Sequence, residues 1–289
     1  MVALPGTGWV PDTPDPRDKT AQTPEVKAQL ARFGAPLLPQ SIDLRNTVPF
    51  PPIDSQGNAQ SCTAHAAASL VEYFETAAFK SYASPSRLFI YKATRNLLQQ
   101  TADSGALLRT TMQALTLFGA PPEVYWPYDL NNLNVEPTPF CYSFAQNFKA
   151  TLYYRYDGAN AAKADVLQQI KTNLAAKLPA MFGFYIFNSM TQAGQNGFIP
   201  FPDTGESAVG AHAVAAIGYD DTLKIRNSNS GNETTGAFLI RNSWGAGWGL
   251  GGYGWLPYQF VLSDLAVDWW SLLKAEWIDS GQFGFARPV

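Results

Sequence analysis

The pattern of the sequence changes near residue 150, and this change constrains the fold more than any other feature. Before it, the segments have the length of helices. Residues 62–80 are the clearest of these, because the stretch from Cys62 to Val71 carries no formal charge, as expected for a helix that is buried on most sides. After it, short aromatic and apolar runs are separated by turn residues, which is typical of antiparallel strands. Helices first and strands second predict an α+β protein with two lobes and a cleft between them.

The remaining expected elements follow the same division. They are helices at 87–100, 105–118 and 165–178, and strands at 151–157, 180–187, 212–220 and 237–244. We divide the chain into an N-terminal arm (1–40), a helical lobe (41–150) and a β-rich lobe with a C-terminal tail (151–289). The polar stretch 222–235 predicts a long surface loop.

The N-terminal arm is rich in proline, aspartate and threonine. Four prolines within its first 16 residues rule out a long helix there, although a short helix fits residues 25–32. Two interpretations remain open. The arm is either a disordered tail, or a segment that lies over the body and its cleft, with Trp9 as an anchor.

The composition argues against several classes of protein. Of the 289 residues, 46% are hydrophobic and 15% are charged, which suffices for a large core. The net charge of −3 argues against a nucleic-acid-binding surface. Two Cys and two His provide neither a Cys- or His-rich metal site nor a disulfide scaffold, so we expect no metal and no cofactor. No apolar run reaches the ~20 residues of a membrane span and no signal peptide is visible, so we expect no membrane partner and leave the compartment open between the cytoplasm and signal-independent export.

Cys62 is a candidate nucleophile. Ser61 fits the N-cap position, which places Cys62 in the first turn of the helix. The unpaired N–H groups of a helix N-terminus favour the thiolate, which is the reactive form of cysteine. The alternative is that Cys62 is a small buried residue of a core helix.

His212 and Asn242 are the candidate partners of that thiol. His212 opens an apolar strand and could act as the base, whereas the other imidazole, His65, lies in a buried Ala-rich turn and is expected to be a core residue. Asn242 ends another strand, and its carbonyl could fix the tautomer of the ring, with Trp244 shielding their hydrogen bond from water. The alternatives are a structural histidine and a Gly-rich hairpin with aromatic packing.

A glycine pattern in the same region does not indicate a nucleotide site. Gly247, Gly249 and Gly252 satisfy G-x-G-x-x-G. A dinucleotide site needs a helix directly afterwards, and residues 253–257 do not begin one. We therefore expect no nucleotide cofactor.

Together these segments resemble the papain-like cysteine peptidases over residues 41–260. The most specific match is the run Asn-Ser-Trp-Gly-x-Gly-Trp-Gly that begins at Asn242. The His-Ala-Val segment at His212 also fits, as does Gln56, which stands six positions before Cys62. The resemblance implies a two-lobed fold, with a helical lobe, an antiparallel β-barrel-like lobe and the active site in the cleft between them.

The resemblance also implies how the chain would act on a peptide or protein substrate. Cys62 and His212 would face each other as thiolate and imidazolium, and the thiolate would form a thioester acyl-enzyme. Gln56 and the backbone N–H of Cys62 would hold the oxyanion, and Asn242 would orient His212. The substrate contacts implied by the resemblance are Ser104, Gly105, Ala211, Ala213 and Trp244.

Several departures from the family keep other readings open. Thr63 stands where the family has an aromatic residue, and His65 stands at a position that is usually apolar. The disulfide framework is missing, so Cys141 is expected to be a free thiol, and only the short arm stands where many members have a long helical propeptide. These features are more similar to the bacterial branch than to the lysosomal or plant branch. The alternatives are a catalytically weak peptide-binding protein and an acyl transferase on the same scaffold.

Overall fold

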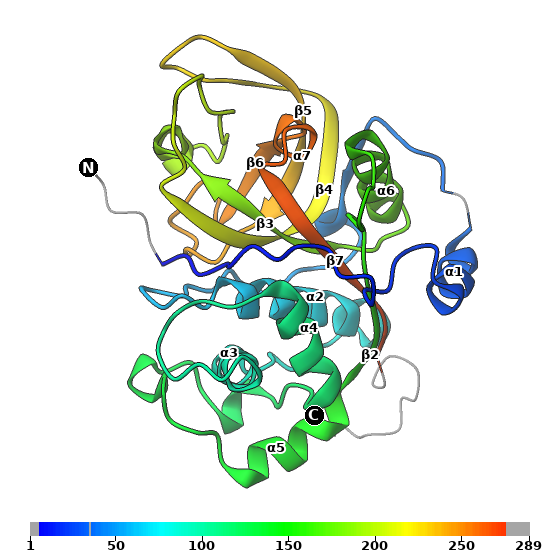
Figure 1. Cartoon of the computed structure of the whole chain (residues 1–289), viewed down its shortest axis with the longest axis vertical. Coiled ribbons are helices and arrows are strands. Elements are labelled where there is room, and N and C mark those ends of the chain that lie inside the picture. Colours follow the sequence, from blue (N-terminus) through cyan, green and yellow to red (C-terminus); the bar gives the residue numbers. More distant parts are fainter. Residues whose placement is uncertain (1–5, 35, 276–289) are drawn as a thin grey trace.

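The computed structural model describes residues 6–34 and 36–275. It has a helical lobe built around α2–α5 and a lobe built around an antiparallel sheet, and the arm runs between them (Figure 1). The α-helices are α1 (Pro24–Leu30), α2 (Cys62–Phe79), α3 (Arg87–Leu97), α4 (Leu108–Leu117), α5 (Pro139–Ala145), α6 (Lys163–Ala175) and α7 (Gln259–Leu262). Short 3-10 helices are η1 (Ala31–Phe33), η2 (Leu44–Asn46), η3 (Glu123–Tyr125), η4 (Leu130–Asn132), η5 (Gln146–Phe148) and η6 (Asn188–Gly194). The α+β class and the papain-like fold are as predicted.

The sheet is antiparallel throughout its described pairings. Its strands are β1 (Ser41–Asp43), β2 (Ala150–Arg155), β3 (Ala180–Ile186), β4 (Gly210–Arg226), β5 (Glu233–Arg241), β6 (Tyr253–Pro257) and β7 (Ala266–Ala275). Their order is β2-β7-β3-β4-β5-β6, and β1 pairs with β4. Strand β3, the first half of β4 and most of β5 are buried, and α2 packs against β3 and β4.

Helix α2 is the central element of the structure and lies between the two lobes (Figure 1). Every residue from Cys62 to Tyr73 is buried, as its uncharged sequence predicts. The helix ends at Lys80, which adopts the left-handed conformation that commonly terminates helices. The first turn of α2 is therefore fixed from all sides, which is what a precisely placed thiol requires.

A buried ion cluster connects α2 to the segment that precedes Gln56. Glu72 of α2 is fully buried and pairs with Arg87 at 2.6 Å. Arg87 also pairs with Asp54 and Glu123. A buried charge is tolerated only when it is paired, so this cluster holds Asp54, and hence the chain leading to Gln56, against the helical lobe.

The structure corrects one prediction and adds three strands. Residues 222–235 are not one long loop: β4 continues to Arg226, β5 begins at Glu233, and Ile225 is buried within this hairpin. The polar side chains of the stretch occupy the solvent face of paired strands, and this concealed the strand pattern. Strands β1, β6 and β7 were not predicted. The three-part division of the chain stays a prediction.

Candidate active site

Cys62 begins α2, as the sequence predicts, and its side chain is fully buried. Burial raises the pKa of the thiol to about 12, although the backbone N–H groups of Ala213, Thr63 and Trp9 act in the opposite direction. The thiol thus lies beside the backbone next to His212 on one side and beside the arm on the other. In this arm-covered structure the neutral thiol is favoured.

His212 and Asn242 come from neighbouring strands and form the expected hydrogen bond. Nε2 of His212 lies 2.8 Å from Oδ1 of Asn242. Because an amide oxygen only accepts, Nε2 carries the proton and Nδ1 is left with a lone pair. Nδ1 has no hydrogen-bond partner within the described residues, so the ring and the thiol are not hydrogen-bonded to each other here.

Burial also acts on the imidazole. It lowers the pKa of His212 to about 4, while the hydrogen bond to Asn242 opposes that shift. The thiolate–imidazolium pair that the resemblance implies is therefore not the form favoured while the site is covered. The physical reason is desolvation, which penalises both charged forms.

Trp244 covers the His212 ring, as predicted. The two rings stack with centroids 4.6 Å apart and an angle of 25° between their planes. The indole is 7% exposed, so it keeps water away from the bond between His212 and Asn242. Its Nε1 donates to the carbonyl of Gly6 at 2.9 Å, so the arm also lies against this residue.

Gln56 is held by hydrogen bonds at both atoms of its side-chain amide. Its Oε1 accepts a hydrogen bond from Oγ of Ser243 at 2.6 Å. Its Nε2 donates to the carbonyl of Ala59 at 2.7 Å and to the carbonyl of Thr7, in the arm, at 3.0 Å. The role of Ser243 was missed, although its position directly after Asn242 in the motif was a usable signal.

The loop from Gln56 to Cys62 is fastened to the helical lobe at two points. Tyr128 places its hydroxyl 2.6 Å from Oγ of Ser61 and donates to the carbonyl of Gln56 at 3.0 Å. Asp103 accepts from the backbone N–H of Gln60 at 3.0 Å, and its own carbonyl accepts from the Gln60 side chain at 2.8 Å. These contacts fix both ends of the loop. Ser61 occupies the N-cap position without capping the helix through its side chain.

The arm lies along the site instead of extending away from the body (Figure 1). Gly8 accepts from the N–H of Ala106 at 2.8 Å, and Val10 donates to the carbonyl of Ala106 at 3.0 Å. Gly8 also donates to the carbonyl of Ala211 at 3.4 Å. The approach is close, since a Cβ on Gly8 would stand 2.0 Å from the carbonyl oxygen of Gln60. Glycine is required there.

The predicted substrate contacts differ in their relation to the arm. Ala211 contacts it directly, and the backbone of Ala213 lies at the thiol. A Cβ on Gly105 would stand 2.2 Å from the carbonyl oxygen of Gly8, but the hydrogen bonds are made by Ala106, the next residue, which the sequence did not single out. Ser104 is exposed and bonds Gln100, so its role stays a prediction.

His65 and Cys141 were predicted to be a core residue and a free thiol, and both predictions agree with the structure. His65 is 4% exposed, with Nδ1 lying 3.1 Å from the carbonyl of Ser61, and burial lowers its pKa to about 3. Cys141 is a free buried thiol.

Within the described residues no helix has the length and apolar character needed to cross a bilayer. No group of three or more His, Cys, Asp or Glu side chains there is arranged to bind a metal.

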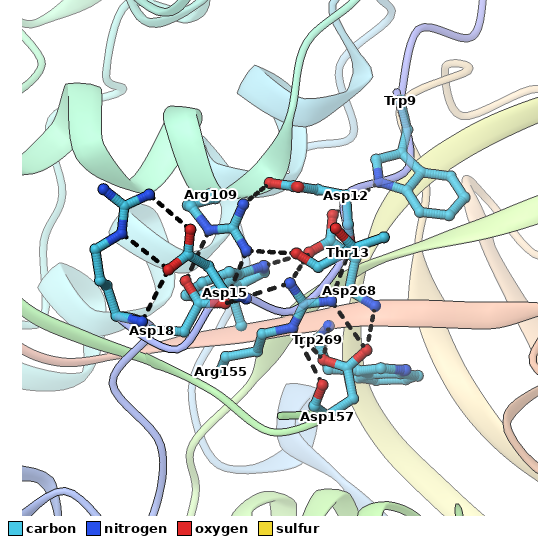
Figure 2. A network of polar contacts seen from close by, with 12 residues as sticks. Trp9, Asp12, Thr13, Asp15, Asp18, Arg109, Arg155, Asp157, Asp268 and Trp269 are labelled. Carbon is cyan, nitrogen blue, oxygen red and sulfur yellow. Dashed lines mark hydrogen bonds and ion pairs between the residues drawn. The ribbon is translucent and has the colours of Figure 1, made fainter. Parts of the chain in front are cut away.

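Beyond Val10 the arm is held by charges (Figure 2). Arg109 of α4 bonds Asp18 at 2.7 Å and also pairs with Asp12. Arg155 of β2 lies 3.6 Å from Asp18 and donates to the carbonyl of Asp12 at 3.0 Å. These groups are largely buried, with side-chain exposures of 16% for Arg109 and 5% for Asp18.

Comparison with known proteins identifies the family of the chain. The sequence matches the papain family cysteine protease model over residues 38–260. It is 33% identical over 276 residues to an uncharacterised peptidase C1-like protein of Acanthamoeba polyphaga mimivirus, covering 91% of this chain and 85% of that protein.

Solved structures give the same result. Xylellain, a cysteine protease from Xylella fastidiosa, superposes with a TM-score of 0.73 and 35% identity over 93% of this chain and 96% of that one. Bromelain from Ananas comosus shares the fold at a TM-score of 0.58 and 20% identity, over 82% of this chain and all (100%) of that one. The chain belongs to the papain family of cysteine proteases.

Proposed function

We propose that this papain-like cysteine peptidase cleaves peptide bonds through Cys62, His212, Asn242 and Gln56, and that the arm blocks the site in cis. One observation carries the proposal. The side-chain amide of Gln56 already holds a peptide carbonyl, that of Thr7, at 3.0 Å, in the same arm segment whose Trp9 N–H lies at the thiol. A group that binds a neutral carbonyl there is placed to bind the oxyanion that forms from it.

The reaction follows from the protonation states. With Nε2 of His212 donating to Asn242, Nδ1 is the nitrogen that takes the proton of the Cys62 thiol. The sulfur attacks the carbonyl carbon, and the oxyanion accepts from the amide of Gln56 and the backbone N–H of Cys62. The imidazolium then protonates the leaving amine, and a thioester remains. His212 next takes a proton from water, whose oxygen attacks the thioester, and the acid product and the free thiol are released.

The arm explains why the buried site has neutral groups. A substrate can reach Cys62 only after the arm leaves, and departure exposes both the thiol and the ring. Exposure removes the desolvation that raises the pKa of Cys62 and lowers that of His212. Opening of the arm therefore favours the ion pair and admits the substrate in one step.

The two cysteines provide a matched test. Cys62→Ala should abolish cleavage of a fluorogenic peptide and labelling by E64, the inhibitor bound in the bromelain structure, whereas Cys141→Ala should leave both unchanged. Gln56→Ala should lower kcat about 10²–10³-fold, as loss of one oxyanion donor does. Full activity in Cys62→Ala would show that Cys62 is not the nucleophile. If the chain with its natural site residues bound peptides after displacement of the arm but did not cleave them, the peptide-binding alternative would be favoured.

A further inference from the structure

Trp9 fills a pocket in the sheet lobe. The indole is 3% exposed and meets Tyr185 edge-on, with ring centroids 5.5 Å apart. Its Nε1 donates to Oδ2 of Asp268 at 3.0 Å (Figure 2). The pocket therefore has apolar walls and a carboxylate at its base.

A glycine within β3 makes the pocket deep enough for an indole. A Cβ on Gly183 would stand 2.0 Å from the ring of Trp9, and its three nearest atoms would all belong to that ring. Glycine in the interior of a buried strand weakens the strand, and it marks a place where another group approaches closely. The absence of a side chain at Gly183 thus leaves room for the side chain that occupies the pocket.

A bulge in β7 supplies the carboxylate. Met181 pairs with Trp270 and Gly183 pairs with Val267, so β7 has one residue more than β3 between these two pairs. Asp268 lies in this bulge with a φ of 64°, a left-handed conformation that a non-glycine residue adopts at some cost. Bulges re-aim side chains beside functional sites. Both Gly183 and the bulge cost stability, and both shape the same pocket.

The pocket opens next to the reactive thiol. The backbone N–H of Trp9 is one of the groups at the sulfur of Cys62, and the preceding carbonyl, that of Gly8, accepts from Ala106. A substrate must bring its own backbone to that sulfur. The residue that takes the place of Trp9 then directs its side chain into the same pocket.

The contacts of Asp268 indicate which side chain fits. Its Oδ1 accepts from Nε1 of Trp270 at 2.7 Å and lies 3.4 Å from Nη1 of Arg155. Within the described residues, its Oδ2 is bonded only by Trp9. When the arm leaves, this buried oxygen loses its partner, which is costly unless the incoming side chain brings a donor.

The charges near the pocket favour a neutral donor over a cation. With the arm removed, the network in Figure 2 retains two cations, Arg109 and Arg155, and two carboxylates, Asp157 and Asp268. These charges balance. A cation on the substrate would therefore add an excess positive charge to a desolvated site.

We propose that Asp268 makes this part of the cleft specific for a large aromatic side chain that carries an N–H donor, which is that of tryptophan. The inference rests on the proposed function, because it assigns the specificity of the same cleft. Asp268 acts by accepting the indole N–H of the substrate where it now accepts that of the arm.

The experiment uses the full chain with Trp9→Ala, so that the arm no longer fills the pocket. A positional-scanning library of fluorogenic peptides should show a preference for tryptophan at one position. At that position, peptides with tryptophan and with 3-benzothienylalanine are then compared. The second side chain has the same shape with sulfur in place of N–H, and we expect its kcat/KM to be about 10- to 100-fold lower.

Two further variants and a control, all in the Trp9→Ala background, test whether the preference for tryptophan depends on Asp268 and Gly183. Asp268→Asn should bring the ratio of kcat/KM for the two peptides close to one. The amide oxygen of the new side chain would accept from Trp270, and its NH2 group would then face the substrate, where it cannot accept the indole N–H. Gly183→Ala should shift the preference to smaller side chains, and cooperative thermal unfolding checks that both variants are folded. Asp165→Asn removes the same charge from an exposed position of α6 and should leave the ratio unchanged.

The outcomes are distinct. Equal cleavage of the two peptides, a preference for lysine or arginine, or an unchanged ratio in a folded Asp268→Asn variant would each overturn this inference while leaving the peptidase in place. Absence of any cleavage, together with absence of E64 labelling, would overturn the proposed function and this inference with it.

Discussion

The two ends of the arm are held by different kinds of contact. Near the thiol, residues 6–10 are bound by backbone hydrogen bonds to Gln56, Ala106 and Ala211 and by the burial of Trp9. From residue 12 to residue 18, the arm is bound by carboxylates that pair with Arg109 and Arg155.

The inner contacts are of the kind that a substrate could also make, whereas the outer contacts attach the arm alone. Any extended peptide can make the backbone hydrogen bonds of the inner segment, so a substrate competes with it directly. The ion pairs of the outer segment need two carboxylates at a fixed distance from the cleft. We infer that the outer contacts raise the local concentration of the inner segment at the thiol, as a tether does.

The largest effect is expected from removing the outer attachment. Arg109→Gln leaves Asp18 without its closest cation, and breaking one side of a buried ion pair costs about 3–5 kcal/mol, less where the groups are partly exposed. We expect roughly a 100-fold rise in the initial rate of peptide cleavage. Arg17→Gln is the control, because Arg17 pairs with Asp15 of the arm itself. Equal rates for Arg109→Gln and the unmodified chain would contradict the role of the outer contacts.

A smaller effect is expected from disturbing the inner segment. Gly8→Ala places a methyl group against the backbone of Gln60 and strains a φ of 123°, and overpacking of this kind costs about 1–3 kcal/mol. Roughly a tenfold rise in the cleavage rate should follow. Gly34→Ala is the matched control, since Gly34 has a φ of 70° but nothing within 4 Å of its Cβ. If both variants behave alike, the close approach at Gly8 is not what holds the arm.

Salt should distinguish the two segments. Raising the ionic strength screens the pairs of Arg109 and has little effect on the contacts of Gly8 and Trp9, which are not ion pairs. The cleavage rate of the unmodified chain should rise a few-fold between about 0.05 and 0.5 M salt. The rate of Arg109→Gln should change much less over the same range. A rate independent of salt in both proteins would speak against electrostatic attachment.

The arm should also change the titration of His212. Burial lowers its pKa to about 4, and opening of the arm should raise it toward the usual value of 6.5. Between these values the open form binds more protons, so a fall in pH from 6.5 to 4 favours opening. Ring-proton NMR of the unmodified chain and of Arg109→Gln measures this shift. His65, whose pKa is lowered to about 3, is the internal control and should titrate alike in both proteins. Identical curves for His212 would contradict this prediction.

How much the sequence could predict depends on how local each signal is. The helix that starts at Cys62, the strand that carries His212 and the hydrogen bond to Asn242 follow from short runs of residues, and the structure has all of them. The register shift at Asp268 depends on how β7 pairs with β3, and nothing near Asp268 in the sequence encodes that pairing.

The position of the arm also could not be predicted from local sequence alone. Its prolines and Trp9 left a disordered tail and a segment anchored over the body both open, and they did not indicate which residues would receive an anchored segment. Ala106 binds the arm through its backbone, so its side chain gives no signal. Gly183 stands in a run of buried aromatic and apolar residues where a glycine is out of place, and this was a usable signal for a close approach.

The fastening of the loop before Cys62 to Asp103 has a practical consequence for handling the protein. The loop that carries Gln56 is held there by hydrogen bonds to Gln60, and neither cysteine is used as a cross-link. Strong reductants, which keep a free thiol from oxidising, therefore have no bridge to cleave in this protein. Expression, purification and assays can all be carried out in millimolar dithiothreitol, with no oxidative refolding step.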